Sequence, residues 1–183
     1  AGGGGGGGSG QPESVGTPGQ PVPRPTNNYR EISGGGIFKA SVPADWAPMT
    51  SKSSIRLVPQ NGYGPLNGQT VFTYGMEFGI TKAPSRDLQE ATKAWLQSVA
   101  QSNPGLKLAG QQQQVRIDQR SAIATPLTNP SPLGGQERII VYTTFLADGT
   151  LFYHFSLVPE NDAAAFQEVF KKVVESIRLT DVR

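Results

Sequence analysis

The chain carries few side chains that could do chemistry. His154 is its single histidine, cysteine is absent, and neither an HExxH motif nor a G-x-S-x-G elbow occurs. Any metal site would therefore rest on carboxylates, and any Ser–His–acid triad would have to use this one histidine. Because His154 lies in the middle of a predicted strand, we expect it to hydrogen-bond a neighbouring group rather than to take part in catalysis.

Carboxylates are the other candidates for acid–base chemistry. Asp87 is explained by capping of a predicted helix, and Asp148 by a predicted turn. Glu77 lies within a predicted strand, where a glutamate more often faces solvent or pairs with a lysine or arginine. We therefore predict no catalytic, cofactor-binding or metal-binding residue, and a hydrolase that uses Glu77 and His154 is kept as a remote alternative.

The charge of the chain indicates no highly charged partner. Its formal net charge is +2 and the basic residues are scattered, which favours neither nucleic acid nor an anionic membrane surface. No apolar stretch reaches the roughly 18–20 residues needed to span a bilayer. The absence of cysteine excludes disulfides and leaves the compartment open, the bacterial periplasm included.

The first 28 residues differ in composition from the rest. A glycine run from Gly2 to Gly8 is followed by five prolines between residues 12 and 25. Such a segment buries too little apolar surface to offset the entropy cost of ordering. We predict a disordered Gly/Pro-rich linker over residues 1–28 and a single domain over residues 29–183. The start at Ala1 leads us to expect a piece of a longer or processed protein.

Two amphipathic helices are predicted from apolar residues that recur every three or four positions. The first begins at Asp87, with Glu90 three residues on as in a capping box, and ends before Asn103-Pro104-Gly105. The second covers about Asp162 to Ile177, with Asn161 as its N-cap. The apolar stripe of the first helix consists of Leu88, Ala91, Thr92, Trp95, Leu96 and Val99.

About seven strands are predicted around these helices. Alternation of apolar residues and flanking turn residues place them at Gly36–Val42, Ser54–Val58, Thr70–Ile80, Leu106–Ile117, Ser121–Leu127, Glu137–Leu146 and Leu151–Val158. The polar run Gln111–Gln114 has no assigned role.

The last two strands are expected to form a hairpin. Asp148-Gly149 between them favours a two-residue type I′ turn. That register would pair Tyr142 with Phe155 and His154 with Thr143. Because both faces of this hairpin are apolar, it should be central in the sheet.

The predicted fold is an α+β class α/β/α sandwich. A central antiparallel sheet of about 6–7 strands would carry one helix on each face. With apolar residues on both faces of the middle strands, we expect no polar cleft in which a reaction could run. Trp46 is expected to plug the core or to cover the sheet edge as a lid, rather than to serve as a platform for a ligand.

Two polar loops are suited to contacting a partner. The first is Asn61–Asn67. The second is the predicted partner-binding segment, and Arg138 beside Glu137 is expected to anchor it by hydrogen bonds. This segment consists of Asn129, Pro130, Ser131, Pro132, Leu133, Gly134, Gly135 and Gln136.

The opening of the domain resembles a known family. Phe38, Pro43 and Trp46 reproduce the F-x-x-x-x-P-x-x-W start of PsbP-like domains. The Asp148-Gly149 hairpin, followed by an amphipathic helix ending at Ser176-Ile177-Arg178-Leu179, is similar to their close. The resemblance implies an α/β/α sandwich around an antiparallel sheet.

A narrower resemblance covers nearly all of Tyr29–Leu179. It is to the C-terminal appendage of bacterial, notably acidobacterial, HtpX-like (CAAX-protease-like) zinc metallopeptidases. The loop Leu127–Glu137 is the most specific match, and residues 1–28 resemble the linker that precedes such appendages. Since the HExxH helix is missing here, no catalytic residue carries over.

The resemblance implies a non-catalytic accessory domain, bacterial and envelope-associated, that binds a protein partner or positions a linked metallopeptidase. We expect it to be monomeric and to need no cofactor. The alternative is a stand-alone PsbP-like module that contacts a larger assembly through its loops.

Overall fold

The computed structural model describes residues 14–181. An antiparallel sheet of eight strands forms the centre of the fold. Its strands are β3 (Ala47–Thr50), β4 (Ser54–Val58), β7 (Gly75–Thr81), β8 (Lys107–Leu108), β9 (Gln113–Ile117), β10 (Arg120–Pro130), β11 (Gln136–Phe145) and β12 (Leu151–Pro159). They follow the spatial order β3-β4-β7-β12-β11-β10-β8, with β9 also paired to β10. The predicted hairpin β11–β12 is thus central, as its two apolar faces indicated.

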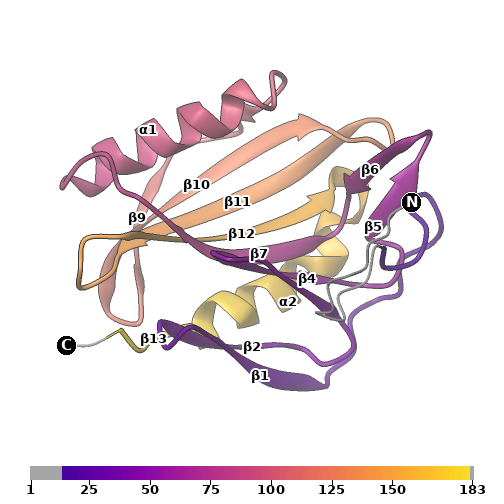
Figure 1. The fold of residues 1–183 in the computed structure, drawn as a ribbon. Helices are drawn as coiled ribbons and strands as arrows, with labels where there is room; N and C mark the ends of the chain where they lie inside the picture. The colour runs from indigo at the N-terminus through magenta and orange to yellow at the C-terminus, as the bar shows by residue number, and fades with distance from the viewer. Residues whose placement is uncertain (1–13, 182–183) are drawn as a thin grey trace.

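Each face of the sheet is covered by one helix, as Figure 1 shows. One face carries α1 (Leu88–Gln101). The other carries α2 (Ala163–Ser176) together with a small sheet of β1 (Tyr29–Gly34), β2 (Phe38–Pro43) and β13 (Arg178–Leu179). A separate hairpin of β5 (Tyr63–Leu66) and β6 (Gln69–Phe72) projects at one end. The predicted α+β class with two main helices is confirmed.

The main core lies on the α2 side of the sheet. Phe38 of β2 stacks on Phe78 of β7 with ring centroids 4.9 Å apart. Trp46 is only 2% exposed and packs against Phe166 and Phe170 of α2. The expectation that Trp46 plugs the core is therefore confirmed. The small sheet, which the sequence did not predict as such, closes this side beside α2.

The start of α1 follows its predicted cap. Asp87 has an extended backbone, and its side chain accepts a hydrogen bond of 2.9 Å from the Glu90 backbone N–H. This bond satisfies one of the donors that every helix leaves free at its beginning. The helix ends at Gln101, before the predicted Asn103-Pro104-Gly105 stop.

The start of α2 differs from the prediction. A 3-10 turn, η2 (Glu160–Asp162), precedes the helix, and Asn161 lies within this turn rather than at the N-cap. Asp162 occupies the cap position without a capping hydrogen bond from its side chain. Its carboxylate instead accepts a hydrogen bond from the Tyr74 hydroxyl, 2.5 Å away. A tertiary contact has thus replaced the local cap.

The predicted register of the central hairpin is wrong by one residue. Leu146 N–H donates to Thr150 O, and Gly149, at φ +88°, donates to Leu146 O. This is a three-residue loop with glycine in the left-handed region, not a two-residue turn. Tyr142 consequently pairs with His154 instead of Phe155. The shift places Tyr153 and Phe155 on the α1 face and His154 on the α2 face.

The stretch predicted as a loop followed by one long strand is instead a hairpin and a separate strand. Asn67 and Gly68, at φ +52° and +84°, make the two-residue turn between β5 and β6. The predicted strand Thr70–Ile80 is interrupted at Thr73-Tyr74, so that β6 and β7 belong to different sheets. Asp118 and Gln119, both with positive φ, form the turn between β9 and β10.

Packing against the domain begins before Tyr29. Val15 is buried, its N–H donates to Tyr63 O over 2.8 Å, and its carbonyl accepts from Asn61 N–H over 2.7 Å. The Asn61 side chain also donates to the Pro21 carbonyl. The Asn61–Asn67 segment, predicted as a loop for a partner, therefore holds part of the predicted linker. Residues 1–13 lie outside the described residues, and for them the linker stays a prediction.

Within residues 14–181, neither helix has the length and apolar character needed to cross a bilayer.

Candidate functional site

A cavity of about 520 Å³ lies between α1 and the sheet, and we call it the α1 cavity. Its size falls within the range of small-ligand pockets. Its lining is mostly apolar with a few polar side chains: Arg56, Val71, Phe72, Glu77, Trp95, Leu96, Val99, Asn103, Leu106, Leu127, Asn129, Pro130, Pro132, Glu137, Ile139, Val141, Tyr153, Phe155 and Leu157. This mostly apolar cavity was not predicted from the sequence.

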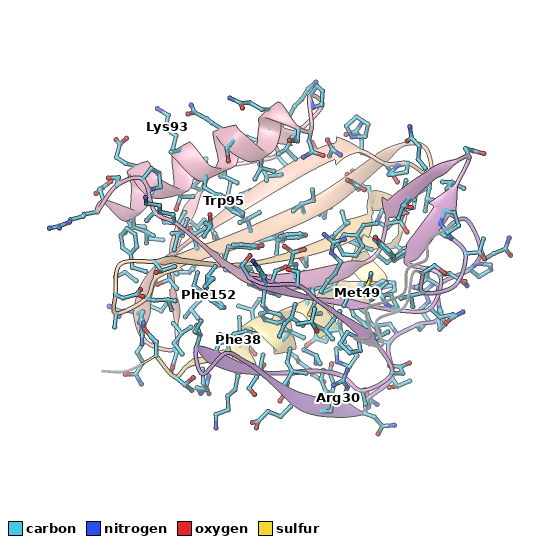
Figure 2. The ribbon with its side chains drawn as sticks, viewed as in Figure 1. Arg30, Phe38, Met49, Lys93, Trp95 and Phe152 are labelled. Carbon is cyan, nitrogen blue, oxygen red and sulfur yellow. The ribbon has the colours of Figure 1, made fainter. Side chains whose placement is uncertain are left out.

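The cavity exists because α1 packs closely on the sheet only through its first half. Ala91 and Thr92 are fully buried, and the Thr92 hydroxyl hydrogen-bonds that of Thr143 over 2.7 Å. Further along, Trp95 and Val99 are only half-buried although they belong to the apolar stripe. Figure 2 shows Trp95 pointing from α1 toward the sheet. The second half of the stripe thus faces the cavity.

One end of the cavity holds a neutralised carboxylate. Arg56 donates to Glu77 Oε1 through Nε at 3.0 Å and Nη2 at 2.9 Å. The Tyr153 hydroxyl donates to Glu77 Oε2 over 2.5 Å. Burial raises the pKa of Tyr153, and the nearby Glu77 carboxylate raises it further. Glu77 pairs with an arginine, as its position in a strand suggested, and has no free oxygen.

Aromatic rings hold this arrangement in place. Tyr153 stacks on Trp95 with centroids 4.6 Å apart, and the Arg56 guanidinium lies 4.2 Å from the Phe72 centroid. Tyr153 crosses β7 where that strand has Gly79, at which a Cβ would lie 2.5 Å from the Tyr153 ring. The glycine therefore makes room for the tyrosine to reach Glu77.

The other end of the cavity holds an unsatisfied carboxyl group. Glu137 is 5% exposed, and its Oε2 accepts a 3.0 Å hydrogen bond from the Asn129 amide. Its Oε1 has no hydrogen-bond partner among the described residues. Burial raises the pKa of Glu137 to about 7, and the Asn129 hydrogen bond only partly opposes the shift. Such an acceptor is costly to bury and marks a place where a donor fits.

The mouth of the cavity is formed by part of the predicted partner-binding segment. Asn129 and Pro130 end β10 and Gln136 begins β11, so only residues 131–135 form a turn. That turn is ordered by hydrogen bonds of Ser131 N–H to Gly135 O and of Gly134 N–H to Ser131 O. Asn129, Pro130 and Pro132 line the cavity. Arg138, the expected anchor of this turn, instead forms an ion pair with Glu160, with its Nη2 3.8 Å from Glu160 Oε2.

His154 lies away from this cavity. It is fully buried on the α2 face, stacked on Phe78 at 4.3 Å, with Nδ1 hydrogen-bonded to the Glu77 backbone carbonyl. Burial lowers its pKa to about 3, so the ring is neutral at ordinary pH. The expected hydrogen bond to a neighbour is confirmed. The side chains of Glu77 and His154 leave opposite faces of the sheet, so these two residues do not come together in one site.

The sequence named several of these residues without bringing them together. Glu77, Trp95 and the Asn129–Gln136 segment were singled out, but the role of Glu137 was missed. A signal was present, because Glu137 shares the alternation of Ile139 and Val141, which point inward. Between residues 14 and 181, no group of three or more His, Asp or Glu side chains is arranged to hold a metal ion.

Comparison of the sequence with protein-family models gives no match, and comparison with curated proteins gives no similar protein. The fold, however, is similar to those of solved structures. Cyanobacterial PsbP (CyanoP) from Synechocystis matches with a TM-score of 0.61 at 11% identity, over 82% of this chain and 92% of that one.

Two further structures share the architecture. The Ran-binding protein Mog1p of Saccharomyces cerevisiae matches with a TM-score of 0.58 at 14% identity, over 84% of this chain and 96% of that one. LpqN of Mycobacterium tuberculosis, described as involved in cell envelope biogenesis, gives 0.52 at 11% identity, over 84% and 91%. At such low identities these likenesses establish the fold alone, and the fold of this chain is PsbP-like.

Proposed function

We propose that this chain is a non-catalytic binding domain that engages a protein partner through the α1 cavity and the turn at its mouth. The observation that carries the proposal is the buried, unsatisfied Glu137 carboxyl in a largely apolar cavity bordered by an ordered, exposed turn. Apolar cavities with a few fixed polar groups are typical binding sites.

Two further features support a binding role. Among residues 14–181, Leu133, in the 131–135 turn, is one of two large apolar side chains that are markedly exposed, at 36%. Mog1p, which has a similar fold, is described as a protein that binds Ran. A partner that inserts an anchor side chain into the cavity would also cover this leucine, because the contacts around such an anchor commonly exclude water.

The test compares two variants of α1 that add the same bulk in different places. Val99→Phe points into the cavity, whereas Gln101→Phe lies on the exposed surface of the same helix. Immobilised proteins are incubated with native lysate, and captured proteins are quantified by mass spectrometry. We expect a stoichiometric partner that wild type and Gln101→Phe retain and Val99→Phe loses. Equal capture by all three proteins would contradict the proposed site.

We further propose that the domain is the C-terminal appendage of a bacterial envelope zinc metallopeptidase and positions partners for it. The support is the sequence resemblance over Tyr29–Leu179, above all in the Leu127–Glu137 loop. Sequencing of the coding region upstream of Ala1 tests this. An HExxH helix there supports the appendage, whereas a lipoprotein signal directly before the linker contradicts it and favours a stand-alone module.

A further inference from the structure

The two ends of the α1 cavity differ in charge. The titratable side chains that line it are Arg56, Glu77, Tyr153 and Glu137. At the first end the Glu77 carboxylate is neutralised by Arg56 and hydrogen-bonded by Tyr153. At the second end Glu137 has only the uncharged Asn129 amide as a partner. An ionised Glu137 therefore leaves the cavity with one uncompensated negative charge.

The C-terminal end of α1 adds to this negative potential. Val99 and Asn103 line the same cavity, and the chain beyond them touches the strand that carries Asn129, since a Cβ on Gly105 would lie 2.5 Å from Pro130 Cδ. The last turn of a helix carries a partial negative charge, although here the Val99 and Ala100 carbonyls accept hydrogen bonds from Ser102 and Asn103. No basic residue lies in the last turn of α1 to offset that charge.

We propose that the group bound in the α1 cavity is a cation on an aliphatic stem, namely a lysine or arginine side chain of the protein partner, paired with Glu137. This inference rests on the proposed function and names the chemistry of its site. The half-buried Val99, Leu106 and Ile139 contact the methylene stem, and the unpartnered carboxyl oxygen accepts the charged N–H. Long basic side chains bind in this way, with a buried stem and a paired head.

A dependence on pH follows from the same geometry. Glu137 is neutral at acidic pH because its burial raises its pKa to about 7. The other charged groups facing the cavity, Arg56 and Glu77, form a pair with each other. Binding of the cation should therefore strengthen as pH rises through 7. The bound cation should in turn stabilise the ionised form of Glu137.

The test uses small probes on the full chain and NMR of the two tryptophan indole N–H groups. Trp95 lines the cavity, whereas Trp46 is buried on the other side of the sheet and serves as the internal control. The probes are Nα-acetyl-lysine methylamide and its norleucine counterpart, which lacks the ammonium group. We expect the lysine compound at pH 8 to shift Trp95 but not Trp46, with at least tenfold weaker binding at pH 5.5.

Two charge-neutralising variants complete the experiment. Glu137→Gln should weaken binding of the lysine compound about tenfold or more and abolish its pH dependence, whereas Glu31→Gln, at an exposed position of β1, should change neither. Equal binding of the norleucine compound would overturn the cationic specificity and leave the cavity as the binding site. If hexylammonium shifts Trp95 while the lysine compound does not, a partner side chain is the wrong ligand. If no probe shifts the Trp95 indole signal, the inference is overturned. The capture experiment still decides the proposed function separately.

Discussion

Glu77, Glu137 and His154 are all buried in the central sheet, and each meets the cost of burial in a different way. Glu77 forms an ion pair with Arg56 and accepts a hydrogen bond from the Tyr153 hydroxyl. Glu137 and His154 each keep one polar atom without a partner among the described residues. Burial favours the neutral form of both groups, so it raises the pKa of Glu137 and lowers that of His154. Their effects on stability therefore have opposite signs as pH changes.

For Glu137 we predict a stability cost at alkaline pH. Its pKa rises from 4.5 in the unfolded chain to about 7 in the folded protein. The folded state thus binds more protons between these values, and stability falls as pH rises through this window. The shift sets an upper limit of about 3 kcal/mol, and water reaching the cavity lowers it to about 1–2 kcal/mol. Glu137→Gln should therefore be more stable than wild type by that amount at pH 8 and equal to it near pH 4.5.

Urea unfolding at the two pH values measures this difference. The amide of Glu137→Gln can still accept from Asn129, so the variant changes the charge and little else. A variant less stable than wild type at pH 8 would show that Glu137 has a partner for its charge in solution.

For His154 we predict a loss of stability in acid. Its folded-state pKa of about 3 lies below the unfolded value of 6.5, so the unfolded state binds more protons as pH falls below 6.5. At pH 4 the loss relative to neutral pH should be about 3 kcal/mol. His154→Leu, of similar size and without a titratable ring, should lack this part of the acid sensitivity. Parallel urea titrations of both proteins between pH 7 and 4 test it, and identical pH profiles would contradict it.

At the scale of elements, strand β7 shapes the cavity through its glycines. Gly75, Glu77 and Gly79 alternate along the strand and so share the α1 face. The Phe72 ring lies against Gly75 and the Tyr153 ring against Gly79. Two aromatic side chains are thereby brought to either side of the buried Glu77, which explains why a strand in the middle of a sheet carries glycine.

We predict that Gly79→Ala disrupts this arrangement. The added methyl would lie 2.5 Å from Tyr153 Cζ and from its hydroxyl oxygen, so the ring must move away from Glu77. Overpacking and the loss of a hydrogen bond to a buried carboxylate together should cost about 2–4 kcal/mol. Gly110→Ala is the matched control, because its methyl would meet only Pro126 at an ordinary 3.5 Å. Thermal unfolding of both variants measures the difference, and equal midpoints would refute the role given to Gly79.

At the level of elements, the sequence predicted features set by local pattern, such as a helix cap. It did not predict the strand register, which a single residue in a turn can change. The α1 cap at Asp87 was predicted because capping is local. The hairpin turn was placed correctly but with two residues instead of three, and that one residue exchanged the faces of His154 and Phe155. The Asn67-Gly68 turn carried a clear hairpin signal, which the neighbouring Asn61-Gly62 and Gly64-Pro65 pairs obscured.

For the whole molecule, the layering was predictable and the cavity was not. Two helices that each carry an apolar stripe, and a hairpin that is apolar on both faces, must bury these surfaces against each other. Few arrangements other than a sheet with a helix on each face allow this. The cavity arises where the apolar stripe of α1 changes from fully buried at Thr92 to half-buried at Val99, a difference that periodicity does not encode. Nor does composition reveal that part of a Gly/Pro-rich segment packs on the domain, because Val15 and Pro18 are buried by residues distant in sequence.

The N-terminal packing gives the last prediction, which concerns where the folded unit begins. Val15 exchanges two backbone hydrogen bonds with Asn61 and Tyr63, Thr17 N–H donates to the Asn61 side chain, and Val22 packs against the main core. Removing residues 14–28 would delete Val15 and expose the part of the β5–β6 hairpin that it covers. Burial of one valine contributes about 1.5–3 kcal/mol, from which the entropy of ordering this segment must be subtracted.

A protein that begins at Tyr29 should therefore be less stable than one that begins at Ser14, by about 1–2 kcal/mol. For a domain of this size the difference corresponds to a midpoint lower by roughly 2–8 °C. Comparing these two truncations in thermal unfolding isolates residues 14–28, because both lack residues 1–13. A third protein, the longer form with Val15→Ser, should show most of the same loss of stability, because the valine is the buried anchor of the segment. Equal midpoints for all three proteins would contradict this prediction and support a folded domain that begins near residue 29, as composition alone predicted.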